Sequence, residues 1–178
     1  MVYTLLADGF EEIEALAVVD ILRRADINTQ TVSITNCNSV CGAHGIEINT
    51  DTKISEIGDY DIIFLPGGYP GYVNLKNSPE VNDLLEKAYN TGKIIVAICA
   101  APSILGEKGF LKGKTACCFP SFEDKLIGAS VSYEDVVISE RIITSRGAGT
   151  AHKLGFKLVE IIKGKEEADK LQDTMLYK

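Results

Sequence analysis

The segment from Lys93 to Pro102, KIIVAICAAP, constrains the fold more than any other stretch of the chain. The apolar and mostly β-branched run Ile94 to Ile98 is typical of a strand that is buried on both faces. Cys99 follows this run, and Pro102 suits the first turn of a helix, where its missing N–H carries no penalty. The segment therefore predicts a buried strand, a tight turn that holds Cys99, and a helix.

The same alternation of strand and helix extends over the whole chain. Such a pattern predicts βαβ units and a mostly parallel sheet with helices on both faces, as in an α/β three-layer sandwich, within a single domain spanning residues 1–178. Strands are expected at 2–6, 29–35, 46–49, 61–65, 93–98 and 114–118, a β-hairpin at 136–139 and 142–145, and helices at 11–25, 79–90, after 102, 149–163 and 166–171.

Composition limits the partners that we expect. The chain has 25 acidic and 18 basic residues, a net charge of −7 and no dense Lys/Arg run, which argues against binding to nucleic acid or an anionic membrane. No apolar stretch approaches the ~20 residues that cross a bilayer, and the N-terminus lacks a leader pattern, so we expect a cytoplasmic protein.

The cysteines indicate no disulfide framework and no metal site. Their number is odd and their spacing lacks the paired pattern of zinc ligands, so we expect neither metal nor other cofactor. If residues 114–118 form a strand, its two adjacent cysteines face opposite ways and one of them is in the core. The five cysteines are Cys37, Cys41, Cys99, Cys117 and Cys118.

Four unusual segments follow predicted strands. They are Asp8-Gly9, Pro66-Gly67-Gly68, Cys99 and Arg146-Gly147-Ala148-Gly149. Sites in open parallel sheets form beyond the carboxyl ends of the strands. We therefore expect these segments to meet at one edge of the sheet and to form the functional site.

Cys99 is the first candidate for chemistry. A thiol at a helix N-terminus feels the positive end of the helix dipole, which is expected to lower its pKa and favour the nucleophilic thiolate. The construction resembles a nucleophile elbow, although the Gly-x-Ser-x-Gly pattern is absent. A buried core cysteine that acts as a small hydrophobe is the alternative reading.

Glu14 is the second candidate, because it falls inside the apolar stripe of the first predicted helix. A buried acid must be protonated or hydrogen-bonded, and burial raises its pKa. Beside a cysteine, such an acid can donate a hydrogen bond to the thiolate or move a proton. Glu14 at the rim of the stripe is the alternative. The stripe consists of Phe10, Ala17, Val18, Ile21 and Ala25.

Backbone and basic groups at the same edge are candidates for anion binding. The N–H groups of Gly67 and Gly68, and that of Ala100 after the cysteine, suit an oxyanion, although a Pro-Gly pair also marks plain turns. Arg146 precedes a predicted helix and attracts anions. The Gly-x-Gly of this segment fails as a dinucleotide fingerprint, because His152 stands where the third glycine is required.

The order and spacing of four motifs resemble the ThiJ/PfpI superfamily, in particular the branch of the Parkinsonism-associated deglycase. The motifs ADGFEEIE at 7–14, LPGG at 65–68, AICAAP at 97–102 and TSRGAGT at 144–150 cover the length of the chain. The resemblance implies a flavodoxin-like fold, a homodimer and a nucleophilic Cys99. It further implies that Glu14 hydrogen-bonds the sulfur and that Gly68 supplies a nearby donor.

The resemblance implies two activities. One is glutathione-independent glyoxalase or deglycase chemistry on a small reactive carbonyl such as methylglyoxal, in which Cys99 forms a hemithioacetal and Glu14 moves the proton. The other is oxidative-stress sensing through oxidation of Cys99 to a sulfinate.

A cysteine amidase or protease is a third reading, and it needs a histidine base beside the thiol. Phe119 stands where several relatives carry that histidine, and neither His44 nor His152 can be placed beside Cys99 from the sequence. His44 replaces an anion-binding arginine of some relatives. That replacement leaves anion recognition to Arg146 or to Arg24 of a second subunit.

Overall fold

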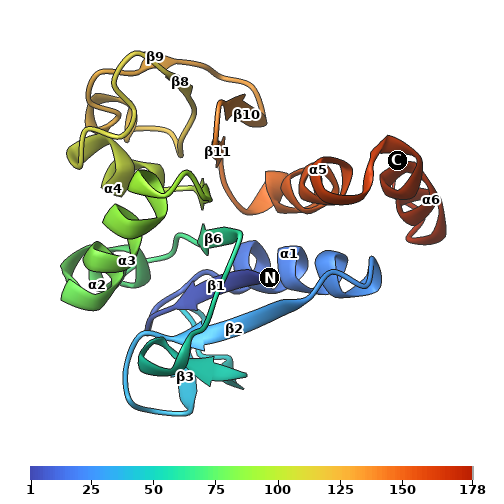
Figure 1. The fold of residues 1–178 in the computed structure, drawn as a ribbon, viewed down its shortest axis with the longest axis horizontal. Coiled ribbons are helices and arrows are strands. Elements are labelled where there is room, and N and C mark those ends of the chain that lie inside the picture. Colours follow the sequence, from blue (N-terminus) through green and yellow to red (C-terminus); the bar gives the residue numbers. More distant parts are fainter. Residues whose placement is uncertain (178) are drawn as a thin grey trace.

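The computed structural model describes residues 1–177, and a mixed sheet lies at its centre (Figure 1). Within these residues the sheet has seven strands in the order β10-β11-β7-β6-β1-β2-β5. All neighbours pair in parallel except β10, which forms an antiparallel hairpin with β11. The strands are β1 (Val2–Leu6), β2 (Thr29–Ser33), β5 (Thr52–Lys53), β6 (Ile62–Leu65), β7 (Ile94–Ile98), β10 (Val136–Ser139) and β11 (Ile142–Ser145).

Helices cover both faces of this sheet, so the predicted α/β class is confirmed. One core cluster joins α1, α5 and α6 to the sheet, and a second joins α2, α3 and α4 to its other face. Figure 1 shows these two groups of helices on opposite sides. The helices are α1 (Glu12–Arg24), α2 (Gly71–Asn77), α3 (Pro79–Asn90), α4 (Pro102–Glu107), α5 (Ala151–Lys163) and α6 (Lys165–Thr174).

The central strand β7 is buried on both faces, as its apolar run predicts. Ile95 and Ala97 belong to one core cluster, whereas Val96 and Ile98 belong to the other. Successive side chains of a strand point to opposite faces, so a strand between two helical layers needs apolar residues at every position. This arrangement carries the next residue, Cys99, to the carboxyl edge of the sheet.

The region around residues 114–118 differs from the prediction. The strand β8 is limited to Thr115–Ala116, and it pairs with β9 (Ser130–Val131) in a separate two-stranded sheet. Both Cys117 and Cys118 are buried, rather than one of them. Cys117 lies outside any strand and donates its backbone N–H to the side-chain hydroxyl of Thr144 in β11 instead of to a backbone carbonyl.

Several short elements complete the description. A second small sheet pairs β3 (Ser39–Cys41) with β4 (Glu47–Asn49), and 3-10 turns occupy Ile54–Glu56, Glu123–Lys125 and Ala148–Thr150. The sequence pattern predicted neither α2 nor β5, which are too short to show a hydrophobic period.

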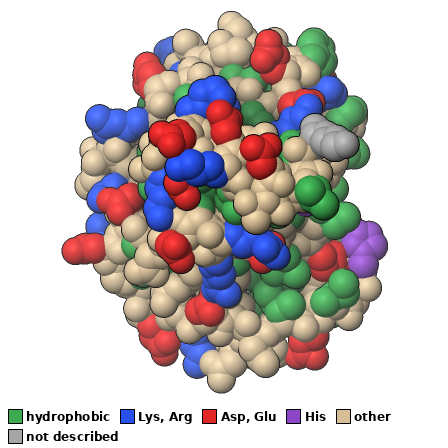
Figure 2. Space-filling view, turned by 90° about the vertical axis from the view of Figure 1, so that its right-hand side faces the viewer, with side chains coloured by type: hydrophobic (Ala, Val, Ile, Leu, Met, Phe, Trp, Pro, Cys, Tyr) green, Lys and Arg blue, Asp and Glu red, His purple; other side chains and the backbone are tan. Residues whose placement is uncertain are grey.

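Acidic and basic side chains are interspersed on the face that Figure 2 shows. Among residues 1–177, no helix combines the length and the apolar character that a membrane span requires.

Candidate active site

Cys99 occupies a sharp turn between β7 and α4. Its φ of 65° lies in the left-handed region, which is uncommon for a residue other than glycine and is often found at functional sites. The Cys99 N–H donates a hydrogen bond of 3.0 Å to the carbonyl of Ser145, and the Cys99 carbonyl accepts one of 2.8 Å from the N–H of Phe119. These two bonds tie the turn to neighbouring segments of the same edge.

Glu14 lies opposite this turn, in the first turn of α1. Its side chain is 1% exposed, so the apolar stripe that contains it does face the core. The carboxyl Oε2 accepts a hydrogen bond of 2.8 Å from the Gly67 N–H. Glu11 caps the helix by accepting the Glu14 N–H. The alternative that placed Glu14 at the rim of the stripe is therefore wrong.

Gly67 lies between the acid and the thiol. A Cβ added to Gly67 would lie 2.6 Å from the Cys99 Cβ, 2.7 Å from the Glu14 Oε2 and 3.0 Å from the Cys99 Sγ. The carboxyl oxygen and the sulfur therefore approach one point, and only a residue without a side chain leaves that point open. We expected the Gly67 N–H to serve an oxyanion, but it is already bonded to Glu14.

A methyl group at this position is expected to destabilise the fold. Gly67→Ala forces the Cys99 and Glu14 side chains apart, and such overpacking costs about 1–3 kcal/mol of unfolding free energy. Urea denaturation of the variant measures this loss. Gly149→Ala is the matched control, because nothing lies within 4 Å of its added Cβ. Equal midpoints for Gly67→Ala and the native protein would contradict the close approach.

The pKa values of the two side chains depend on each other. Burial raises the pKa of Glu14 to about 7. The pKa of the Cys99 thiol is raised to about 12, mainly by burial and secondly by the negative charge of Glu14. The backbone N–H groups of Ala100 and Gly68 oppose this shift, because they face the sulfur and stabilise its thiolate.

The expectation of a lowered thiol pKa is therefore wrong when Glu14 is ionised. α4 has only 6 residues, so its dipole does not outweigh burial beside a carboxylate. When Glu14 is protonated, its repulsion of the thiolate disappears and the two backbone donors remain. Two groups that interact this closely lose their protons as a pair. The charge of Glu14 thus controls the reactivity of Cys99.

The other candidate anion-binding groups divide between those near the sulfur and those away from it. Gly68 and Ala100 face the sulfur, and Gly68 has a φ of +93° that favours glycine. The guanidinium carbon of Arg146, by contrast, lies 5.8 Å from the centroid of the Tyr133 ring. Arg24 pairs with Asp20 in the last turn of α1, about 15 Å along the axis from Glu14.

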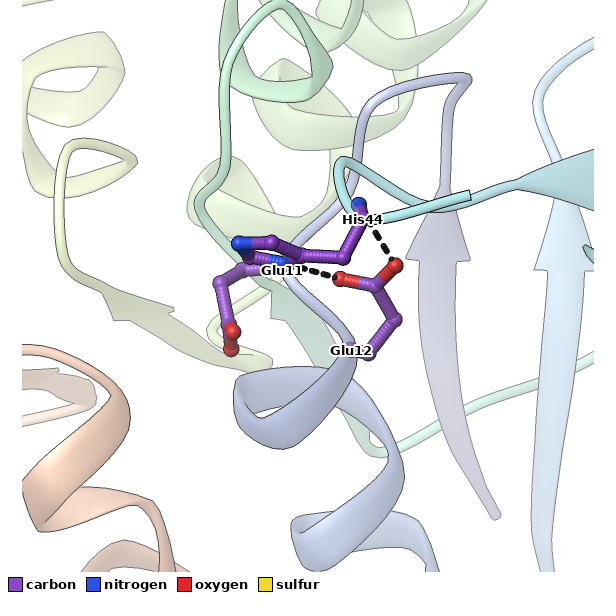
Figure 3. A group of neighbouring side chains, drawn as sticks. All are labelled: Glu11, Glu12 and His44. Carbon is purple, nitrogen blue, oxygen red and sulfur yellow. Dashed lines mark hydrogen bonds and ion pairs between the residues drawn. The ribbon is translucent and has the colours of Figure 1, made fainter. Parts of the chain in front are cut away.

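His44 lies at the start of α1 rather than at the thiol. Its backbone N–H and its ring Nδ1 both bond to Glu12, each at 2.8 Å, and this contact raises the pKa of His44 (Figure 3). The second histidine, His152, stacks on Tyr177. In the described part of the chain, neither histidine is hydrogen-bonded to Cys99.

Glu11, Glu12 and His44 also form a group whose potential metal-ligand atoms lie within 4.8 Å of one another. Both Glu12 oxygens already accept hydrogen bonds from His44, and Glu11 caps the helix. These atoms are used within the protein, so we assign no metal to the group.

Phe119 and Gly147 also lie at the site, as expected from the resemblance for Phe119 and from its strand-end segment for Gly147. The Phe119 N–H bonds to the Cys99 carbonyl at 2.8 Å, and its ring lies beside Gly147. The hydrogen bond between Phe119 and Cys99 involves the loop that follows β8, and no local sequence pattern predicts a contact between residues this far apart in the chain.

Comparison with known proteins decides the family. The sequence profile of the DJ-1/PfpI family matches residues 1–161. The chain belongs to the DJ-1/PfpI family. Its fold is the flavodoxin-like fold of this family, since it superposes on the structure of oxidized Toxoplasma gondii DJ-1 with a TM-score of 0.94 and 34% identity, over 99% of this chain and 97% of the other.

Two curated DJ-1/PfpI relatives differ in length. The chain is 37% identical to the Arabidopsis thaliana protein DJ-1 homolog B, over 97% of this chain but only 40% of that protein. It is 34% identical to the Caenorhabditis elegans glutathione-independent glyoxalase DJR-1.2, over 90% of this chain and 87% of that protein. The chain thus spans less than half of the plant relative and most of the nematode one.

Proposed function

We propose that this DJ-1/PfpI protein is a cysteine-dependent, glutathione-independent glyoxalase that converts α-oxoaldehydes such as methylglyoxal to hydroxy acids such as lactate. The observation that carries the proposal is the meeting of the Cys99 sulfur and the Glu14 carboxyl beside Gly67. A nucleophile and a proton carrier with a pKa of about 7 then face the same reacting carbon. The name of the C. elegans relative supports the same chemistry.

The first step forms a covalent bond. The Cys99 thiolate attacks the aldehyde carbon, and the aldehyde oxygen takes up a proton to give a hemithioacetal. Backbone N–H groups of Gly68 and Ala100 stabilise the thiolate before the attack. The proton that the Cys99 thiol loses passes to the aldehyde oxygen, so this step neither gains nor loses a proton.

The next steps move one proton and release the product. The Glu14 carboxylate removes the proton from the former aldehyde carbon, and the electron pair forms a carbon–carbon double bond while the neighbouring carbonyl oxygen takes the hydroxyl proton of the hemithioacetal, giving an enediolate. Glu14 returns its proton to the second carbon, and the former aldehyde oxygen becomes the carbonyl of a lactate thioester on Cys99. Water hydrolyses this thioester and restores the thiol. Overall, one methylglyoxal and one water give one lactate, and the reaction needs no external oxidant.

Lactate formation without glutathione tests the proposal. Reduced protein is incubated with methylglyoxal, and lactate is measured by NMR against buffer alone and against heat-denatured protein. Only the native protein is expected to form lactate catalytically. No lactate from protein whose Cys99 is shown to be reduced and whose fold is intact would refute glyoxalase activity. Release of native amines from glycated peptides tests deglycase activity in the same samples.

Redox sensing is the second candidate. The donors that face the Cys99 sulfur, together with a protonated Glu14, suit a sulfinate, which carries acceptor oxygens. A related structure from T. gondii is described as oxidized. Peroxide is then expected to add two oxygen atoms to Cys99 selectively, as measured by mass spectrometry of its peptide. Oxidation spread evenly over the exposed cysteines, including Cys37 and Cys41, would contradict this role.

A homodimer is also part of the proposal. The exposed side chains Ile13 and Ile46 both flank Glu12, which leaves apolar surface beside the site. In the proposed dimer, Arg24 of a second subunit supplies a positive charge to the site. Light scattering of the native protein and of Ile13→Glu tests it, and a native mass of one chain would contradict it.

A further inference from the structure

The Cys99–Glu14 site has an apolar wall that the proposed mechanism does not use. The point at which a Cβ of Gly147 would lie is 3.3 Å from Cδ2 of the Phe119 ring and 3.9 Å from Oε1 of Glu14. Glu14 therefore turns one oxygen toward Gly67 and the other toward Gly147. The Phe119 ring also borders that second point.

The position of Phe119 is set by the backbone, while its ring remains accessible. Its N–H bonds to the carbonyl of the nucleophile residue itself, which fixes the distance between ring and thiol turn. The side chain nevertheless is 46% exposed. A large apolar ring that is held at a reactive turn and only half covered leaves one face for another apolar group.

The Arg146 side chain does not occupy this position. Arg146 precedes Gly147 but is directed to the Tyr133 ring and carbonyl. The Phe119 ring offers no hydrogen-bond donor, so it gives no advantage to the hydrated, diol form of a small aldehyde. An apolar substituent instead gains from leaving water.

We propose that Phe119 and Gly147 form an apolar subsite for the substituent of the α-oxoaldehyde, and that this subsite makes aryl-substituted substrates such as phenylglyoxal preferred over unsubstituted glyoxal. The proposal rests on the glyoxalase function proposed above and names the substrate class of the same site. Phe119 acts as a specificity residue, since it contacts the substituent and moves no proton. Gly147 leaves the space between the ring and Glu14 open.

Substrate selectivity of Phe119→Ala tests the subsite. The ratio of kcat/KM for phenylglyoxal to that for glyoxal is expected to fall roughly 10-fold or more. Ile138→Ala is the matched control, because Ile138 is 47% exposed on the edge strand β10 and its loss should leave the ratio unchanged. An equal fall for both aldehydes, or an unchanged ratio, would overturn the subsite.

Gly147→Ala provides a second variant. The φ of Gly147 is 163°, an extended conformation that alanine adopts, so the backbone tolerates the change. The added methyl group narrows the gap to the ring, and the phenylglyoxal rate should fall more than the glyoxal rate. A larger fall for glyoxal would contradict the placement of the substituent.

Alkylation of Cys99 separates failure of the subsite from failure of the glyoxalase function. The rates with N-phenyliodoacetamide and with iodoacetamide are compared in native protein, Phe119→Ala and Ile138→Ala. Preference for the phenyl reagent that is lost only in Phe119→Ala supports the subsite even if neither aldehyde is turned over. Absence of that preference in native protein overturns the subsite, whatever the lactate assay shows.

Discussion

Cys99→Ser is expected to lower lactate formation by about 1000-fold or more, the scale on which loss of a covalent nucleophile acts in other enzymes. A serine hydroxyl fits the same turn, but it does not ionise beside the Glu14 carboxylate. Among residues 1–177, no histidine is bonded to residue 99 that could activate the hydroxyl. The variant should fold, because the turn is held by backbone hydrogen bonds to Ser145 and Phe119. Lactate formation and circular dichroism measure the two outcomes.

The same chemical change at another cysteine is the control. Cys37 is exposed and far along the chain from the site motifs, so Cys37→Ser should keep native activity. Activity that survives in Cys99→Ser would exclude the sulfur as the nucleophile. Activity that is lost in both variants would show a nonspecific dependence on thiols rather than a role for the elbow.

The parts of the fold that follow from local sequence were predicted well. The hairpin strands 136–139 and 142–145 have the bounds that the apolar runs and the intervening two residues indicate. The helix Pro79–Asn90 begins at a proline and is capped by Ser78, both of which are visible in the sequence. By contrast, the local sequence of residues 114–118 does not show whether their apolar side chains are buried within the central sheet or outside it.

The candidate site was predicted in position but not in its electrostatics. The strand ends placed Gly67 and Cys99 at one edge, the apolar stripe of the first helix singled out Glu14, and the structure brings the three residues together. Burial raises the pKa of the Cys99 thiol most, and the charge of Glu14, which approaches from a helix 85 residues earlier in the chain, raises it further. Helix-dipole reasoning from the local sequence includes neither effect, so it gave the opposite direction.

Glu14→Gln is expected to lower lactate formation by about 100- to 10,000-fold, the range for loss of a general acid–base group. The amide can still accept the Gly67 N–H, but it cannot take a proton from the hemithioacetal. In native protein the rate should rise as the pH passes about 7, where Glu14 ionises. This rise should be absent in Glu14→Gln. An active variant with the same rise would refute the proton-transfer role.

Thiol reactivity should change in the opposite direction. Removal of the carboxylate charge beside the sulfur lowers the pKa of Cys99 from its raised value, since burial alone then opposes the two backbone donors. Glu14→Gln should therefore react faster with iodoacetamide at neutral pH than native protein, although it makes far less lactate. Slower alkylation would show that Glu14 activates the thiol rather than restraining it.

Stability provides a further test of the buried carboxyl. The pKa of Glu14 is about 7 in the folded protein and 4.5 in its ordinary state, so the folded chain binds more protons between these values. Stability should then fall as the pH rises through this window, by about 3 kcal/mol in total. Glu14→Gln has no such proton to lose and should become the more stable protein above pH 7. Urea denaturation of both at acid and alkaline pH measures the difference, and parallel pH profiles would mean that Glu14 remains ionised in the folded state.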